Sequence, residues 1–172
     1  MGYDSRDQDM EQASRNYGRA VHGAVAVLVV FASSFIGNAA TMPNIPTWYA
    51  ELQKPWFTPP NWLFGPVWSL LYTGLIIAFY RILRHDCQTQ GRRRAIMVFC
   101  VQIALNALWS ISFFGLRSPA LGLVVIVFLW LSIVANMIVF RQIDRLSSWA
   151  FPPYLAWVTF AAALNVAIFV LN

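Results

Sequence analysis

Charged residues divide the chain into long neutral segments. After a polar N-terminal stretch, five segments contain no Asp, Glu, Lys or Arg, namely residues 20–50, 55–80, 95–116, 118–140 and 146–172. A helix needs about 20 apolar residues to cross a bilayer, because the hydrocarbon core is about 30 Å thick and each residue rises about 1.5 Å. Every segment is long enough. The pattern therefore predicts an all-α, polytopic membrane protein built as a bundle of five transmembrane helices.

Prolines and polar residues set the expected ends of these spans. We expect one membrane domain over residues 20–172, with spans at about 20–41, 62–83, 95–115, 119–140 and 151–171. Residues 1–19 mix four acids with three arginines and are expected to form a polar, disordered tail. The loop 42–61 contains five prolines, which make it stiff without making it helical, so it should cover the bundle. Asn61 is a candidate N-cap for the second span.

Composition and charge agree with a membrane protein. The chain is 59% hydrophobic and 11% charged, whereas soluble domains are about 25% charged. Under the predicted topology, ten Lys and Arg residues lie on the side of the N-terminus and two on the other side. Because basic residues remain in the cytoplasm, we expect a cytoplasmic N-terminus, and a bacterial inner membrane is favoured. The scattered basic residues form no nucleic-acid footprint, so no nucleic-acid partner is expected.

The spans offer no groups for ordinary catalysis or metal binding. No acid or base lies within them except His22 at an edge, which argues against a pump or an ion-coupled transporter. Phosphate-binding loops, nucleophile elbows and zinc-binding spacings are also absent from the sequence. Cys87 and Cys100 are expected at different depths, which excludes a disulfide framework. We therefore expect no catalytic residue, no metal and no required cofactor.

Aromatic and amide residues gather on one face of three spans. The spacings that place them there are those of an α-helix. The residues are Trp68 and Tyr72 on the second span, Gln102, Asn106, Trp109 and Phe113 on the third, and Tyr154, Trp157, Ala161, Leu164 and Asn165 on the fifth. In one interpretation, the amides form interhelical hydrogen bonds and the aromatic residues anchor the protein at the membrane interface. In the other, these residues converge on a cavity for a flat apolar ligand. Both interpretations place the amides inside the bundle.

Three long motifs carry a family resemblance. These are WYAELQKPWFTPPNWLFGPVWSLLY at 48–72, QIALNALWSISFFGLR at 102–117 and PYLAWVTFAAALN at 153–165. Together they resemble the translocator protein family (TspO/MBR), also called tryptophan-rich sensory proteins or peripheral-type benzodiazepine receptors. The resemblance covers about residues 20–172. It implies a five-helix bundle, commonly a homodimer, with a ligand pocket capped by the loop between the first two helices. A mitochondrial outer membrane is the alternative location that the family suggests.

The resemblance also implies ligands and a binding site. Its members bind porphyrins and haem-pathway intermediates, sterols such as cholesterol, and benzodiazepine-type or isoquinoline-type compounds. By motif position, the ligand-binding role carries over to Trp48, Tyr49, Trp68, Asn106, Trp109, Trp157, Ala161, Leu164 and Asn165. Some bacterial members are reported to degrade bound porphyrin in light, and Trp68 and Trp157 match the implicated tryptophans. Animal members carry a sterol motif in a basic tail, whereas residues 167–172, AIFVLN, have no Arg or Lys, which weakens the sterol expectation.

The leading hypothesis is a membrane receptor or sensor that binds tetrapyrroles and affects their transport, turnover or signalling. We expect the macrocycle to stack between Trp68, Trp109 and Trp157, with Asn106 and Asn165 offering hydrogen bonds. One alternative is a light-dependent and oxygen-dependent porphyrin-degrading enzyme. Another is a membrane scaffold protein. In every case Trp56 and Trp62 are expected to be interface anchors.

Overall fold

The computed structural model describes residues 3–172, and the side chains from residue 8 onward. Its long helices are α1 (Tyr3–Thr41), α3 (Asn61–Arg84), α4 (Arg92–Ser110), α5 (Pro119–Ile143) and α7 (Phe151–Leu171). Shorter elements are η1 (Met42–Asn44), α2 (Trp48–Glu51), the π-helical turn η2 (Ile111–Gly115) that continues α4, and α6 (Arg145–Ser148). Five helical segments in the described part of the chain are long and apolar enough to span a membrane. The prediction of an all-α, five-helix membrane bundle is confirmed.

The helix ends follow from local side-chain chemistry. Ser118 caps α5 by accepting a hydrogen bond from the backbone N–H of Leu121, and Pro119 opens that helix. Asp144 caps α6 in the same way through the N–H of Leu146. Asn61 is not the cap that the sequence suggested. It is the first residue of α3, and its side chain makes no capping hydrogen bond.

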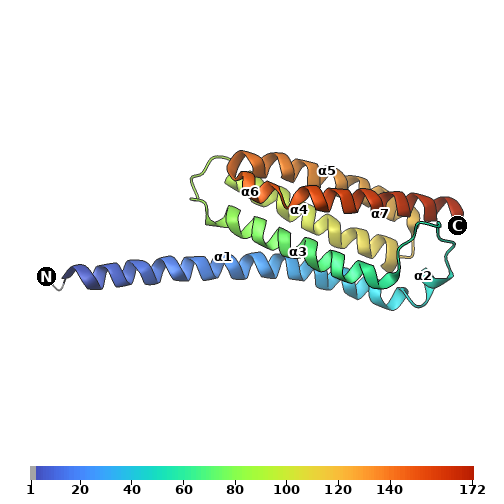
Figure 1. The fold of residues 1–172 in the computed structure, drawn as a ribbon, viewed down its shortest axis with the longest axis horizontal. Helices are drawn as coiled ribbons and strands as arrows, with labels where there is room; N and C mark the ends of the chain where they lie inside the picture. Colours follow the sequence, from blue (N-terminus) through green and yellow to red (C-terminus); the bar gives the residue numbers. More distant parts are fainter. Residues whose placement is uncertain (1–2) are drawn as a thin grey trace.

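The long helices run alongside one another, and α1 lies at one side of the bundle next to α3 (Figure 1). Contacts are most extensive between α4 and α5, between α5 and α7, and between α1 and its neighbours α3 and α4. α7 packs mainly on α5 and touches α3 only slightly. We call the end that holds η1, α2 and the C-terminus the lid end. The opposite end, with the α3–α4 connection and α6, is the basic end.

Buried aromatic rings hold the basic half of the bundle together. Phe79 of α3 stacks on Phe99 of α4, with ring centroids 4.1 Å apart. Phe99 in turn contacts Phe140 of α5, which meets Phe151 of α7 edge to face at 4.9 Å. These four rings are at most 1% exposed. They close the basic half of the bundle as a packed core, so the room for a ligand lies towards the lid end.

The N-terminal residues differ from the expectation of a disordered tail. The structure continues α1 back to Tyr3, so residues 3–19 form a helix that projects beyond the bundle at the basic end (Figure 1). Its described side chains are almost all exposed, and Arg15 and Glu11 form an ion pair at 3.5 Å across one turn. Once a long span has nucleated a helix, each added residue gains a backbone hydrogen bond without a new nucleation cost. When η2 is counted with α4, the other helix bounds lie within three residues of the expected spans.

Candidate functional site

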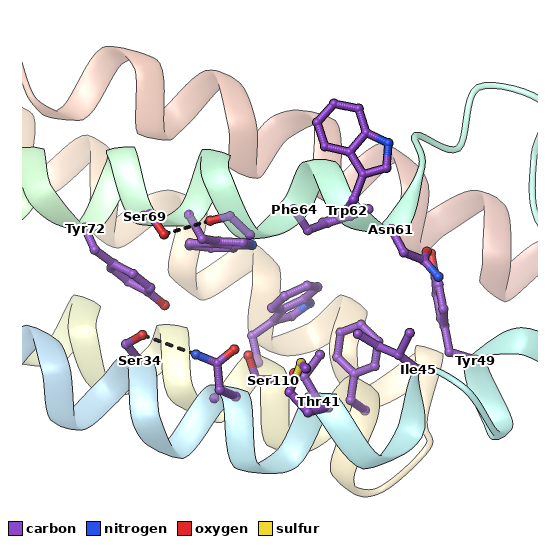
Figure 2. A pocket seen from close by; sticks show the side chains of 17 residues that line it. Ser34, Thr41, Ile45, Tyr49, Asn61, Trp62, Phe64, Ser69, Tyr72 and Ser110 are labelled. Atoms are coloured by element: carbon purple, nitrogen blue, oxygen red, sulfur yellow. Dashed lines mark hydrogen bonds between the residues drawn. The ribbon is translucent and has the colours of Figure 1, made fainter.

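A cavity of about 510 Å³ lies between α1 and α3 at the lid end, with α4 and η2 behind it (Figure 2). Its volume is in the range of small-molecule and cofactor sites, about 300–1,000 Å³. Side chains reach it from α1, from α3, and from residues 42–60, which connect these two helices and which we call the lid. The end of α4 with η2 also contributes (Figure 2). The lining residues are Ser34, Gly37, Asn38, Thr41, Met42, Ile45, Tyr49, Asn61, Trp62, Phe64, Gly65, Trp68, Ser69, Tyr72, Trp109, Ser110 and Phe114.

The two long walls of the cavity differ in chemistry. α1 contributes small and polar residues at helical spacing, including Ser34, Asn38 and Thr41, whereas α3 contributes mostly aromatic rings. Gly37 lets α1 approach α4 closely, because a Cβ there would lie 3.1 Å from Ser110 Oγ. The cavity therefore presents an aromatic wall opposite a polar one, and none of the described residues that line it is charged.

The lid is fixed over the cavity by ring contacts. The Tyr49 ring lies 5.5 Å from the Phe114 ring and 6.4 Å from the Phe113 ring, centroid to centroid. Lys54 Nζ lies over the Tyr49 ring, 4.7 Å from its centroid and within cation–π range. Burial raises the pKa of the Tyr49 phenol above its ordinary value, so this side chain stays neutral at physiological pH. Tyr49 thus closes the cavity as an uncharged aromatic ring.

Two polar contacts tie the same lid to the bundle. Arg117 Nε donates to Asn44 Oδ1 at 3.0 Å, and Asn44 is nearly buried. Asn172 at the end of α7 pairs with the backbone of Gln53, accepting from its N–H at 3.0 Å and donating to its carbonyl at 3.1 Å. Arg117 has a φ of 53°, which a side-chain-bearing residue seldom adopts. The surrounding contacts hold it there, so the lid is a positioned cover and not a free loop.

The π-helical turn η2 places two consecutive phenylalanines beside the cavity. Its wider winding is visible in the bond from the Leu116 N–H to the Ile111 carbonyl at 2.7 Å, five residues back. Phe113 stacks on Trp109 with centroids 5.8 Å apart, and Phe114 meets the same indole edge to face at 6.0 Å. Single π turns occur frequently at functional sites. Here the turn builds the aromatic end of the cavity under Tyr49.

A chain of buried hydrogen bonds supports the inner end of the cavity. Tyr72 Oη donates to Asn106 Oδ1 at 2.7 Å, and Asn106 Nδ2 donates to Tyr154 Oη at 2.8 Å. Gln102 Nε2 donates to the same Tyr154 oxygen at 3.1 Å. Trp68 lies over this chain, with its ring 5.3 Å from Tyr72 and 6.1 Å from Tyr154. Gln102, Asn106 and Tyr154 are buried, as the sequence predicted for the amides.

The nine residues expected to bind ligand fall into three groups. Tyr49, Trp68 and Trp109 line the cavity. Asn106 and Asn165 do not line it but hold residues that do, since Asn165 Oδ1 accepts from Trp109 Nε1 at 3.3 Å and Asn106 accepts from Tyr72. The remaining four, Trp48, Trp157, Ala161 and Leu164, are outside the lining.

Those four residues form a layer behind the cavity. Trp48 packs on Phe113, and Trp157 packs on Phe64, with both ring pairs 5.6 Å apart. Ala161 and Leu164 are buried in the helix packing. α7 was expected to form a cavity wall, but the rings of α3 and η2 stand between it and the open space. Of the three tryptophans expected to stack on a macrocycle, Trp68 and Trp109 line the cavity and Trp157 does not.

Sequence reasoning missed the contribution of α1. The small and polar residues Ser34, Gly37, Asn38 and Thr41 recur every three or four positions, which is the signal of one helix face. No role was predicted for this face from the sequence. Trp62 also belongs to the lining, although it is 71% exposed and its indole points away from the gap between α1 and α3 (Figure 2).

Comparisons with known proteins agree with the motifs. The sequence profile of the TspO/MBR family matches residues 24–171. The tryptophan-rich protein TspO of Archaeoglobus fulgidus is 42% identical over 147 residues, which are 86% of this chain and 94% of that protein. Protein CrtK of Rhodobacter capsulatus is 39% identical over 84% of this chain and 94% of its own length. The human translocator protein is 31% identical over 78% of this chain and 80% of its own length.

Proposed function

This chain belongs to the TspO/MBR family of integral, multi-pass membrane proteins, and we propose that it is a receptor or sensor that binds tetrapyrroles in the cavity under its lid. Binding would affect the transport, turnover or signalling of the tetrapyrrole. Sterols and benzodiazepine-type compounds are further ligand classes for the same cavity. We also propose a cytoplasmic N-terminus, a bacterial inner membrane and a homodimeric assembly.

One observation carries the tetrapyrrole proposal, namely the ring-lined space between α1 and α3. Its aromatic residues include Trp68, Tyr72, Trp109 and Phe114, with Tyr49 as the cover. Each stacked ring contributes on the order of 1 kcal/mol beyond the burial of its surface. Several such rings support micromolar binding of a large flat molecule without a buried charge. The polar face of α1 leaves room for the polar edge of that molecule.

Protoporphyrin IX binding to protein in lipid nanodiscs tests the proposal through quenching of tryptophan fluorescence. Trp68→Phe keeps an aromatic ring but removes the indole that lines the cavity, so we expect affinity to fall several-fold. Trp149→Phe is the matched control, because Trp149 is 71% exposed and lies outside the cavity lining. Trp157→Phe should have a smaller effect than Trp68→Phe, since Trp157 acts only through Phe64. Equal affinities in wild type, Trp68→Phe and Trp149→Phe would refute the site.

The same preparation separates the alternatives. A light-dependent enzyme would convert more than one equivalent of porphyrin into a defined product, with dioxygen consumed alongside. A binding protein would bleach at most about one equivalent. In either case we expect photooxidation to modify Trp68 before Trp157, because Trp68 lines the cavity, and peptide mass analysis would locate it. A scaffold protein would keep its partner complex when Trp68 and Trp109 are both replaced by Phe.

A further inference from the structure

We propose that the inner end of the cavity selects ligands by their hydrogen-bond donors, with the Tyr72 hydroxyl as the accepting group. This inference rests on the proposed function for the location of the site and names the chemistry of the ligand that fits it. The ligand would be a flat aromatic molecule that carries an N–H or O–H group at its leading edge. Tyr72 is the specificity-determining residue, and Asn106 and Tyr154 are positioning residues.

The orientation of the Tyr72 proton follows from its partner. A carbonyl oxygen can only accept a hydrogen bond, so the 2.7 Å contact with Asn106 Oδ1 requires Tyr72 to donate its single proton to it. The Tyr72 hydroxyl points into the gap between α3 and α1 (Figure 2), and the residue lines the cavity. Its proton is directed to Asn106, so a lone pair of the oxygen is what a ligand meets. The hydroxyl therefore acts as an acceptor.

The amide of Asn106 is held in this orientation from behind. Its Nδ2 donates to Tyr154 Oη at 2.8 Å, which leaves Oδ1 on the side of Tyr72. Asn106 is 1% exposed and Tyr154 is fully buried, so neither has water as a substitute partner. A hydrogen-bond chain in such surroundings is costly to rearrange, because an unmatched polar group there loses the full energy of its bond. The direction of these hydrogen bonds thus leaves the Tyr72 oxygen as an acceptor for a ligand.

A second hydroxyl at this end also has its proton bound within the protein and offers only its oxygen as an acceptor. Ser69 lies one helical turn before Tyr72 on α3 and also lines the cavity. Its Oγ donates to the Gly65 carbonyl at 2.9 Å, so its proton is likewise held by the protein (Figure 2). Across the gap, Ser34 Oγ accepts a hydrogen bond from Asn38 Nδ2 at 3.5 Å. The two hydroxyls from α3 therefore present oxygen lone pairs to a ligand.

This polarity has consequences for a tetrapyrrole. The pyrrole and lactam N–H groups of an open-chain tetrapyrrole match the acceptors, whereas the N–H groups of a closed macrocycle point to its centre and do not reach them. Ionised propionates carry only lone pairs and would be repelled from this end. The carboxylates are therefore expected towards the open side of the cavity, away from Tyr72 and Ser69. A ligand that lacks a donor leaves the Tyr72 oxygen desolvated without a partner, which is the usual source of strong discrimination between isosteric molecules.

Three tricyclic probes of nearly identical shape isolate the effect. Carbazole carries an N–H donor, dibenzofuran carries an oxygen acceptor at the same position, and fluorene carries a methylene group that does neither. Equilibrium dialysis of protein in lipid nanodiscs against empty nanodiscs measures binding after subtraction of the lipid partition. For wild type we expect carbazole to bind tightest and dibenzofuran weakest, with roughly a three- to tenfold difference between them.

Three variants assign the effect to the chain of hydrogen bonds. Tyr72→Phe removes the acceptor and should bring the carbazole-to-dibenzofuran ratio close to that of membrane partition alone. Tyr154→Phe removes the group that holds the Asn106 amide, so the amide can turn and the ratio should fall although the cavity lining is unchanged. Tyr80→Phe, on the same helix but outside the cavity lining, should keep the wild-type ratio. Unchanged fluorene binding in all three shows that the shape of the cavity is intact.

The outcomes separate this inference from the proposed function. Equal ratios in wild type and Tyr72→Phe, or a wild-type preference for dibenzofuran, would overturn the inference even if protoporphyrin IX binds as proposed. A wild-type preference for dibenzofuran would mean that Asn106 presents Nδ2 to Tyr72 and donates to its hydroxyl oxygen. A carbazole preference that depends on Tyr72, found in a protein that fails to bind protoporphyrin IX, would support the inference and refute the tetrapyrrole proposal. Loss of fluorene binding in Tyr72→Phe together with wild-type ratios in Tyr154→Phe would also overturn it.

Discussion

Gly122 of α5 lies in close contact with side chains of α7 and η2 behind the cavity, so Gly122→Ala tests the packing directly. A Cβ at this position would lie 2.8 Å from Asn165 Oδ1 and 2.9 Å from Phe113 Cδ2. Both distances are shorter than ordinary van der Waals contacts. The added methyl group therefore requires at least one of these two side chains to move.

Neither neighbour can move without losing other contacts. Asn165 Nδ2 donates to the Pro119 carbonyl at 2.9 Å while its Oδ1 accepts from Trp109. Phe113 is 3% exposed and stacks on Trp109. Overpacking of such a site costs about 1–3 kcal/mol, and the lost Trp109 hydrogen bond about 1 kcal/mol more. The higher helix propensity of Ala returns up to about 1 kcal/mol, so we expect a net loss of about 1–3 kcal/mol.

Thermal unfolding in detergent, followed by circular dichroism, measures the first effect. At about 2–4 °C per kcal/mol for a chain of this size, Tm should fall by roughly 2–12 °C. Protoporphyrin IX affinity should fall as well, because Trp109 is displaced from its position in the cavity lining. Gly74→Ala is the control, since its Cβ would make an ordinary contact of 3.8 Å with Ala150 Cβ. A Gly122→Ala protein with the Tm and the affinity of the control would refute the packing argument.

Two further predictions concern the ends of the bundle. The Arg81 guanidinium, 2.6 Å from Asp144, lowers the pKa of that carboxyl to about 2, so the ion pair stabilises the fold above about pH 4 and its contribution is lost as the pH falls towards 2. Asp144→Asn should therefore cost about 1–2 kcal/mol at pH 7, allowing for the partial exposure of Arg81, and unfolding of variant and wild type should converge near pH 2. At the lid end, Arg117→Gly relieves the left-handed backbone but removes the bond to Asn44. We expect faster amide hydrogen exchange in residues 42–51 with Tm unchanged or raised, and unchanged exchange there would contradict the role of this contact.

The fold was predictable because the membrane imposes a simple rule on the sequence. Apolar segments of sufficient length must become helices, since no water satisfies their backbone groups inside the bilayer. Arg117, Ser118 and Pro119 interrupt the apolar sequence and mark the turn between α4 and α5. The rule does not apply to residues 3–19, because they are polar, and their composition is typical both of disorder and of an exposed helix. Their helicity depends on attachment to the span that follows, which composition does not record.

The site was predictable only in part, because helical periodicity shows which residues share a face but not what covers that face. Trp68 and Trp109, which spacing and motif positions placed at a cavity, line the cavity of the structure, and their contact with a ligand stays a prediction. Trp157 has the same kind of spacing, but Phe64 of α3 stands between it and the open space. Which of two aromatic faces is exposed to a cavity depends on the relative rotation of α3 and α7. That rotation follows from packing between distant segments and not from either segment alone.

The two readings of the buried amides that the sequence left open describe one arrangement. Asn106 links α4 to α3 and α7 through Tyr72 and Tyr154, and Asn165 links α7 to α4 and α5 through Trp109 and the Pro119 carbonyl. Each amide is thus an interhelical connection, as the structural reading held. Each also fixes a side chain that lines the cavity, as the functional reading held. A substitution at either amide must therefore change helix packing and ligand selection together, and a binding defect alone would not distinguish a contact residue from a positioning one. The ratio of affinities for matched ligands, such as carbazole and dibenzofuran, distinguishes the two.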